Sequence, residues 1–323
     1  MLTPEILIIA SEENEHAQKI QAYIQDKHTQ NVLILDIAEF PKNYTCEFYV
    51  SNSGNKLVLL ASEEKKCISF EKLRSVWWWA PGIPKISDKL QSKDFVAFAY
   101  TECCQFLNAI SYTSQDCLWV NQPERQEIAL NSIYQLQAAK IAGFKIPETL
   151  ITSHPDSLKS FWEKYNTKVN YRPLIPLGAS LARLLKEHLE ETENLVLAPC
   201  LFQEAFVFKK FFCVLMIGNF PVPVEVFYKD DYETPLFKTF ECPAEILKKI
   251  QNLMKITGLL YASIELGLDH QDNCIFLGID PIPSFKEIQE QTKISITEIL
   301  SELLFRGKIA SPYSFWPTLT PHG

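Results

Sequence analysis

The sequence has little glycine, ten residues in 323, and it lacks the short motifs that usually mark a catalytic or nucleotide site. It contains no GxxxxGKS/T phosphate-binding loop and no GxGxxG fingerprint. The GxSxG turn of hydrolases and the HExxH zinc motif are also absent. Any site must therefore be sought among acids and cations at the ends of strands.

Paired cysteines are missing as well. The nine cysteines are scattered, apart from the adjacent Cys103 and Cys104, and none forms a CxxC pair. The six histidines are spread thinly, which argues against a metal site built on imidazole. We expect free thiols in a reducing cytosol.

A basic leader and a long apolar run are also lacking. Residues 1–15 (MLTPEILIIASEENE) have a short apolar run without a basic lead or a cleavage pattern, so they read as a first strand. No apolar run approaches the ~20 residues that span a bilayer. A formal net charge of -8 argues against nucleic acid or an anionic membrane as the main partner. We expect a soluble, cytoplasmic protein.

What the sequence does have is apolar content: 47% of its residues are hydrophobic and 12% are aromatic, enough for two or three compact domains. Residues 5–10 (EILIIA) and 31–36 (NVLILD) are typical of strands covered on both faces, and the amphipathic residues 12–27 join them. This order predicts a βαβ unit with a parallel sheet. The predicted α/β domain, residues 1–120, is completed by a hairpin (47–51 and 56–61) turning at Gly54, a strand at 75–79 and a helix at 93–112.

The remaining residues, 121–323, show helices and strands that give way to antiparallel pairs, which is typical of an α+β region. The predicted helices span 124–142, 154–165, 181–191, 243–257 and 295–305. The predicted strands span 145–153 and 168–174, followed by a pair that turns at Gly218 and Asn219 and by a final hairpin, 261–280.

The final hairpin carries two carboxylates, Glu265 within one strand and Asp280 at the end of the next. If the strands pair across a turn at 269–273, Glu265 lies opposite Leu277 and the two acids face one cleft. Two such carboxylates can hold Mg²⁺, which prefers oxygen ligands. Alternatively, Glu265 pairs with a lysine and Asp280 caps a turn.

Polar side chains in two other strands are candidates for binding a nucleotide. Arg172 lies in an apolar strand, where a lone guanidinium is costly unless a phosphate or a structural carboxylate pairs with it. Gln203 and Glu204 lie in a strand of otherwise apolar residues. They are either exposed edge residues or a hinge that hydrogen-bonds a nucleoside.

Taken together, these segments resemble the ATP-grasp ligases that modify ribosomal peptides, of the microviridin or graspetide type, over nearly the whole chain. The resemblance starts at the strand Trp77-Trp78-Trp79-Ala80, which ends a pre-ATP-grasp α/β domain. It continues through Phe202-Gln203-Glu204 and the closing strands YASIEL and IFLGIDP. Between them lies a helix pattern matched by Asn131, Gln135, Leu136, Ala139, Gly143, Ile146, Pro147 and Thr149.

The resemblance implies an ATP-grasp fold and a chemistry in which a side-chain carboxylate becomes an acyl phosphate that a hydroxyl or amine attacks. Several positions depart from the family pattern. Ile133 stands in place of a phosphate-binding lysine, Arg172 in place of a second lysine, and Cys213 in place of an arginine. At the metal-binding end, the aspartate, glutamate and asparagine of the pattern are Glu265, Gly278 and Asp280.

These departures remove charges that a triphosphate needs, because phosphoryl transfer depends on metals and cations. Each charged hydrogen bond lost is worth roughly 1.5–3 kcal/mol. Losing a lysine, an arginine and a metal carboxylate would cost roughly 4–9 kcal/mol, or about three to six powers of ten in rate. Arg172 or Lys209 would compensate only in part.

Our leading hypothesis is an ATP-grasp-like scaffold that binds a peptide or protein partner, with weak or no ligase activity and with ATP and Mg²⁺ binding weakened or lost. The strand Trp77-Trp78-Trp79 is then a contact surface or, alternatively, a buried core strand. No nucleic acid or membrane is expected as a partner, and a homodimer is left open. The residues assigned to a nucleotide are Arg172, Gln203, Glu204 and Lys209, and those assigned to a metal are Glu265 and Asp280.

The alternative hypothesis is an active ATP-dependent ligase that joins a carboxylate to a hydroxyl or amine of a ribosomal peptide. It would place Arg172 on phosphate, Glu204 near the nucleoside, and Glu265 with Asp280 on Mg²⁺.

Overall fold

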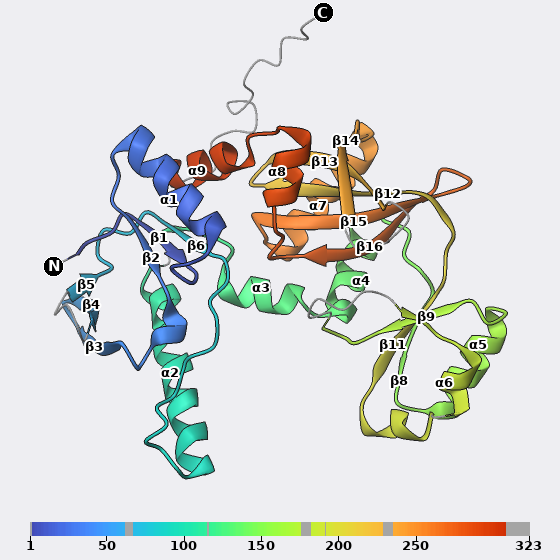
Figure 1. The fold of residues 1–323 in the computed structure, drawn as a ribbon, viewed down its shortest axis with the longest axis horizontal. Coiled ribbons are helices and arrows are strands. Elements are labelled where there is room, and N and C mark those ends of the chain that lie inside the picture. Colours follow the sequence, from blue (N-terminus) through green and yellow to red (C-terminus); the bar gives the residue numbers. More distant parts are fainter. Residues whose placement is uncertain are drawn as a thin grey trace, which may run out of the picture. The chain divides into compact units, whose positions relative to one another are not determined.

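The computed structural model describes residues 2–61, 67–114, 116–175, 182–190, 192–228 and 235–307 (Figure 1). The chain folds into two compact units. Unit 1 holds the residues up to Pro123, the short segment Ile217–Phe220 and the residues from Lys293 on. Unit 2 holds Glu124–Met216 and Pro221–Thr292.

Unit 1 is built on a four-stranded parallel sheet with the strand order β2-β1-β6-β7. All four residues of β1 (Ile6–Ile9) are buried, as expected of a strand covered on both faces. Helix α1 (Glu15–His28) joins β1 to β2 (Val32–Leu35), so the predicted βαβ unit is confirmed. The other two strands are β6 (Ser75–Trp78) and β7 (Leu118–Val120).

A second, antiparallel sheet in unit 1 has the order β3-β4-β5. The predicted hairpin is confirmed: β3 (Tyr44–Ser51) pairs with β4 (Gly54–Ala61), and Gly54 has a φ of 142° that a side chain would disfavour. The short helix η1 (Ile37–Glu39), β5 (Cys67–Ser69) and the long helix α2 (Lys93–Thr113) complete this part.

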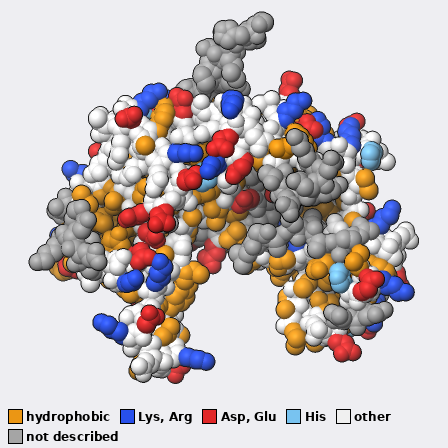
Figure 2. Space-filling model, viewed as in Figure 1, with side chains coloured by type: hydrophobic (Ala, Val, Ile, Leu, Met, Phe, Trp, Pro, Cys, Tyr) orange, Lys and Arg blue, Asp and Glu red, His pale blue; other side chains and the backbone are white. Residues whose placement is uncertain are grey.

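Helix α2 packs into the core near its C-terminal end, where Leu107 and Ile110 are buried, whereas Phe95 and Phe98 near its start are exposed. Figure 2 shows apolar surface along this helix at the lower left of the view. None of the described helices combines the length and apolar composition needed to cross a membrane.

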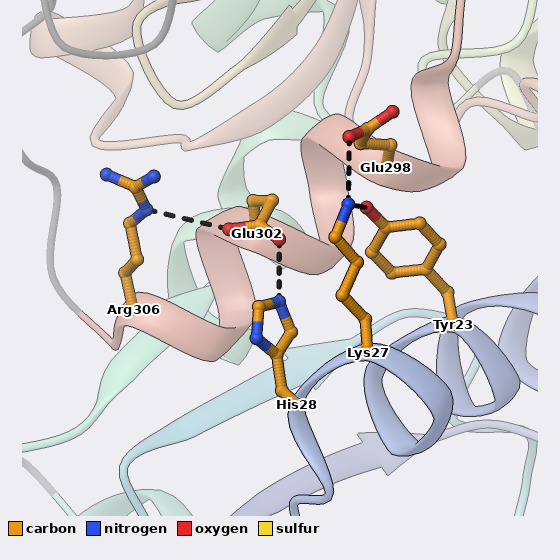
Figure 3. Close-up of polar contacts among 6 residues, drawn as sticks. All are labelled: Tyr23, Lys27, His28, Glu298, Glu302 and Arg306. Carbon is orange, nitrogen blue, oxygen red and sulfur yellow. Dashed lines mark hydrogen bonds and ion pairs between the residues drawn. The ribbon is translucent and has the colours of Figure 1, made fainter.

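The last described helix, α9 (Ile296–Arg306), packs against α1, far away in sequence (Figure 3). His28 Nε2 lies 2.6 Å from Glu302 Oε1, and Lys27 Nζ lies 3.6 Å from Glu298 Oε1. The buried Ser75 hydroxyl of β6 donates a hydrogen bond of 2.7 Å to the carbonyl of Leu304. The chain therefore returns to finish unit 1 with its final helix.

Unit 2 begins with two helices rather than the single predicted helix 124–142: α3 (Pro123–Ala129) and α4 (Ser132–Ile141). The break lies at Asn131, which has an extended backbone and accepts hydrogen bonds from the N–H groups of Ile133 (2.9 Å) and Tyr134 (3.3 Å). Such a side-chain cap starts a new helix. The apolar spacing does not reveal this cap, so it predicted a single long helix in place of two short ones.

The first sheet of unit 2 has the order β10-β9-β11-β8. Its strands are β8 (Thr149–Thr152), β9 (Val169–Arg172), β10 (Ala182–Arg183) and β11 (Cys200–Glu204), and its helices are α5 (Pro155–Lys164), α6 (Lys186–Glu190) and η2 (Thr192–Leu197). The predicted helix 181–191 is wrong at its start, because Ala182 and Arg183 pair with β9; Leu181 and Glu191 lie outside the described residues. Sheet pairing overrides helix propensity here.

The second sheet of unit 2 has the order β14-β13-β12-β15-β16, as the predicted antiparallel region required. Helix α7 (Ala244–Thr257) contributes Ile250 and Leu253 to the core beneath it. The strands are β12 (Phe208–Ile217), β13 (Phe220–Tyr228), β14 (Pro235–Thr239), β15 (Tyr261–Asp269) and β16 (Cys274–Asp280), followed by α8 (Lys286–Thr292).

Candidate functional site

The hairpin β15–β16 places its polar residues on one face by means of a β-bulge. Next to the turn, Leu266 pairs with Phe276, but the register then shifts and Glu265 pairs with Gly278. The predicted pairing of Glu265 with Leu277 is therefore wrong by one residue, because the bulge takes up Leu277 as an extra residue. Paired residues, and residues two apart, share a face of a sheet. Ser263 and Asp280, which also pair, therefore lie on the face of Glu265 and Gly278.

Gly278 lies at the centre of three polar groups. A Cβ atom at this position would be 3.2 Å from Glu265 Oε2, 3.7 Å from Gln135 Oε1 and 4.0 Å from Arg172 Nη1. A carboxylate, an amide and a guanidinium thus surround one position that has no side chain. The arrangement brings together Arg172 and Glu265, which are 93 residues apart and were proposed separately from the sequence.

Arg172, the last residue of β9, is a buried cation with 7% of its surface exposed. Its Nη2 donates to the carbonyl of Leu277 across a long 3.5 Å, and its Nε has no hydrogen-bond partner in the described part of the chain. Burial lowers the pKa of Arg172, and the Glu265 carboxylate raises it in return. Of the two partners considered from the sequence, the structure supplies a carboxylate, Glu265.

The two carboxylates differ in exposure but share the direction of their pKa shifts. Glu265 is open to solvent, yet desolvation by the surrounding protein, and next the charge of Asp280, raise its pKa, while Arg172 lowers it. Asp280 is half-buried, which raises its pKa, and its Oδ1 accepts a 2.9 Å hydrogen bond from the N–H of Ile282.

Cys213 of β12 adjoins the same face. Burial raises the pKa of its thiol to about 12; a hydrogen bond with the Ser263 side chain works against this rise, and Glu265 and Asp280 add to it. The thiol is therefore neutral at physiological pH. It supplies no positive charge at the position where the resemblance leads one to expect an arginine.

Gln135 of α4 fixes the backbone of β16 behind this face. Its side chain is 1% exposed, its Nε2 donates to the carbonyls of Ala129 (2.6 Å) and Ile279 (2.8 Å), and its Oε1 accepts from the N–H of Ile279 (3.0 Å). Ile279 lies between Gly278 and Asp280, so this amide positions both. The residue was noted in the sequence only as part of the helix pattern, and the pattern alone does not reveal the contacts across the chain.

The other residues assigned to a nucleotide lie in differing surroundings. Gln203 is buried and its Nε2 donates to the hydroxyl of Thr149 at 3.0 Å, within the sheet of β8 and β11. Glu204, the next residue, is half-buried at the end of β11. Lys209 shares a face of β12 with Cys213 by strand alternation, and its ammonium is paired with Asp272 in the β15–β16 turn.

Trp77 and Trp78 of β6, and Trp79 directly after it, are buried inside unit 1. Trp77, Trp78 and Trp79 expose 0%, 9% and 5% of their surface. These values fit a buried core strand better than a contact surface, because side chains covered to this extent present little surface to a partner.

The side chains around Gly278 suit a divalent cation poorly. No group of three or more His, Cys, Asp or Glu side chains within the described ranges is arranged to hold a metal ion. The face offers two carboxylates, separated by a glycine, with a neutral thiol on one side and a guanidinium close to Glu265. Mg²⁺ needs several oxygen ligands in near-octahedral geometry, so these residues do not fit a pair of magnesium ions.

Asp280→Asn is expected to raise the melting temperature at pH 7. Because the folded-state pKa of Asp280 is raised, the folded protein binds this proton more tightly than the unfolded chain, so it loses stability as the pH rises through that pKa. Asparagine removes the charge and keeps an acceptor for the N–H of Ile282. The difference from wild type should vanish below about pH 4, near the pKa of an unfolded aspartate. Thermal unfolding of both proteins from pH 4 to pH 8 measures this difference in melting temperature.

Asp269 in the same hairpin is the control of opposite sign. Hydrogen bonds from Asn273 lower the pKa of Asp269, so its charge stabilises the fold above about pH 4. Asp269→Asn should therefore lower the melting temperature at pH 7. If Asp280→Asn also lowered it, our account of the Asp280 environment would be wrong.

Comparison with solved structures gives the class of the fold. The chain has the ATP-grasp fold, as the resemblance predicted, and it matches such structures over more than nine-tenths of its length. The macrocyclase MdnC of Microcystis aeruginosa, bound with precursor peptide MdnA, superposes with a TM-score of 0.82 at 19% identity, covering 93% of this chain and 99% of MdnC.

Two further structures are similar. A RiPP-associated ATP-grasp ligase of Chryseobacterium gregarium, in complex with ADP and a leader and core peptide, gives a TM-score of 0.80 at 20% identity and covers 94% of this chain and 97% of its own. The ATP-grasp ligase PsnB, complexed with a minimal precursor, Mg and ADP, gives 0.79 at 17% identity and covers 95% and 98%. No protein-family model and no curated protein matches the sequence.

Proposed function

We propose that this protein is an ATP-grasp peptide-ligase-like protein that binds a peptide or protein partner and has weak or no ligase activity. The observation that carries the proposal is the face around Gly278, where one buried guanidinium is set against two carboxylates and a neutral thiol. A triphosphate must be neutralised by metal ions or by cationic side chains. The described residues of this face offer one guanidinium, which lies beside Glu265, and ligands that suit Mg²⁺ poorly.

The peptide part of the proposal rests on the fold. Solved structures with this fold, at TM-scores of 0.82 and 0.80, hold a precursor peptide or a leader and core peptide. A partner of the same kind is the simplest ligand for a chain that retains the fold over its whole matched length. A cytoplasmic location is part of the same proposal, since all nine cysteines are free thiols.

An active ligase is the second candidate, and one observation favours it. Arg172, Glu265 and Asp280 converge on one face, although they come from separate strands. In this reading Arg172 contacts a phosphate, Glu204 lies near the nucleoside, and Glu265 with Asp280 holds Mg²⁺ beside ATP.

Thermal unfolding with and without Mg-ATP separates the two candidates. A nucleotide present at ~100 times its Kd would stabilise the protein by about 2.7 kcal/mol, or roughly 4 °C. We expect a shift below about 2 °C and no ADP formation above the buffer background. A large shift with Mg-ATP that Glu265→Ala abolishes would refute the inactive scaffold and favour the ligase.

A further inference from the structure

Among the described lysines and arginines of unit 2, Arg172 is the buried one, and it lies beside the acidic face of the hairpin. Its Nη1 and Glu265 Oε2 both lie within 4.0 Å of the same point, the Cβ position of Gly278. Glu265 is the carboxylate that raises the pKa of Arg172 against the effect of burial. The two charges therefore interact across the position of the missing side chain.

A Cβ atom at Gly278 would lie 4.0 Å from Arg172 Nη1, in ordinary contact, and 3.2 Å from Glu265 Oε2, which is tighter. A side chain longer than that of alanine would fill the space between Glu265, Gln135 and Arg172. The bulge at Leu277 turns the carbonyl of that residue toward Arg172, whose Nη2 donates to it at 3.5 Å. A charge held this way cannot withdraw into solvent easily, since only 7% of the residue is exposed.

We propose that Arg172 is the permanent counter-ion of Glu265, so that this face binds no divalent cation tightly by itself. The inference concerns the same residues as the proposed function and explains why the donor set fits magnesium poorly. A fixed positive charge near a carboxylate repels an incoming doubly charged ion. Any nucleotide that binds here would bring its own metal ion or none.

Titration of Mn²⁺ into the nucleotide-free protein tests the inference, with free Mn²⁺ counted by electron paramagnetic resonance. The wild type should show no site in the micromolar range. Arg172→Gln removes the counter-ion and leaves Glu265 and Asp280 free for a metal, so its affinity for Mn²⁺ should rise by at least ~10-fold. The double variant Arg172→Gln with Glu265→Gln should lose this gain.

Arg172→Lys is the matched control, because it keeps the charge and should bind Mn²⁺ as weakly as the wild type. Far-ultraviolet circular dichroism and a cooperative thermal transition establish that each variant is folded. If Arg172→Gln fails to fold, the wild-type titration still decides: micromolar binding that Glu265→Gln abolishes would overturn the inference, and its absence supports it. A folded Arg172→Gln protein that gains no affinity would also overturn it.

The outcomes are separate from those of the proposed function. Weak Mn²⁺ binding by the wild type with a gain in Arg172→Gln supports the counter-ion whether or not nucleotide or peptide binds. Strong stabilisation by Mg-ATP would refute the inactive scaffold, but it would not change what the Mn²⁺ titration says about the counter-ion.

Discussion

Replacing Gln135 by leucine is expected to lower the free energy of unfolding by about 3 kcal/mol or more, the largest effect of any single side chain in the site. The leucine would leave the carbonyls of Ala129 and Ile279 and the N–H of Ile279 buried without partners. Each unsatisfied buried group costs roughly 1–3 kcal/mol. Urea denaturation at neutral pH, read by far-ultraviolet circular dichroism, measures the change.

Gln137 on the same helix provides the matched control. It is exposed, so Gln137→Leu should alter the stability by no more than about 0.5 kcal/mol. Equal effects at the two positions would mean that helix α4 responds to leucine in general and that the contacts of Gln135 with β16 carry little energy.

Gly267→Ala is expected to destabilise the protein by about 1–3 kcal/mol, the second large effect. A Cβ atom on Gly267 of β15 would lie 2.4 Å from Phe208 Cδ1, 2.5 Å from Cε1 and 2.9 Å from Cγ. The ring cannot yield by moving its far end alone, because its attachment atom is among those contacted. It is also packed 5.7 Å from the ring of Phe206 and 5.0 Å from that of Phe211, between ring centroids. Chemical denaturation again gives the difference.

A double variant isolates the cause. Phe208→Ala removes the ring, so adding Gly267→Ala to it should cost much less than adding it to the wild type. Gly278→Ala serves as a comparison, since the nearest atom to its Cβ is the end of the flexible Glu265 side chain at 3.2 Å. Additive effects of the two changes at positions 208 and 267 would disprove the steric explanation.

The elements that could be predicted are those in which pattern and packing agree. The apolar runs of β1 and β2 and the amphipathic α1 between them lead directly to the parallel sheet. The elements that were wrong depend on contacts made elsewhere in the chain. Ala182 and Arg183 form a strand because β9 is beside them, and helix 124–142 divides because Asn131 turns its side chain back onto the next turn.

In the site, too, some features could be predicted from the sequence and others depend on contacts made elsewhere in the chain. Arg172, Glu265 and Asp280 could be singled out from the sequence, because charged side chains in apolar strands need a reason to be there. The face they share could not be derived correctly, since a one-residue bulge decides which residue lies opposite Glu265. Gln135 and Gln137 look alike in the sequence, and only the fold makes one of them a buried bridge.

The position of α9 bears on how the protein is made. During synthesis, α1 and β6 leave the ribosome long before α9, the helix that packs on α1 and whose Leu304 carbonyl accepts the Ser75 hydroxyl. Until then a nascent chain displays the bare flank of α1 and an unsatisfied serine on β6. Unit 1 can therefore finish its packing only after the whole of unit 2 has been synthesised.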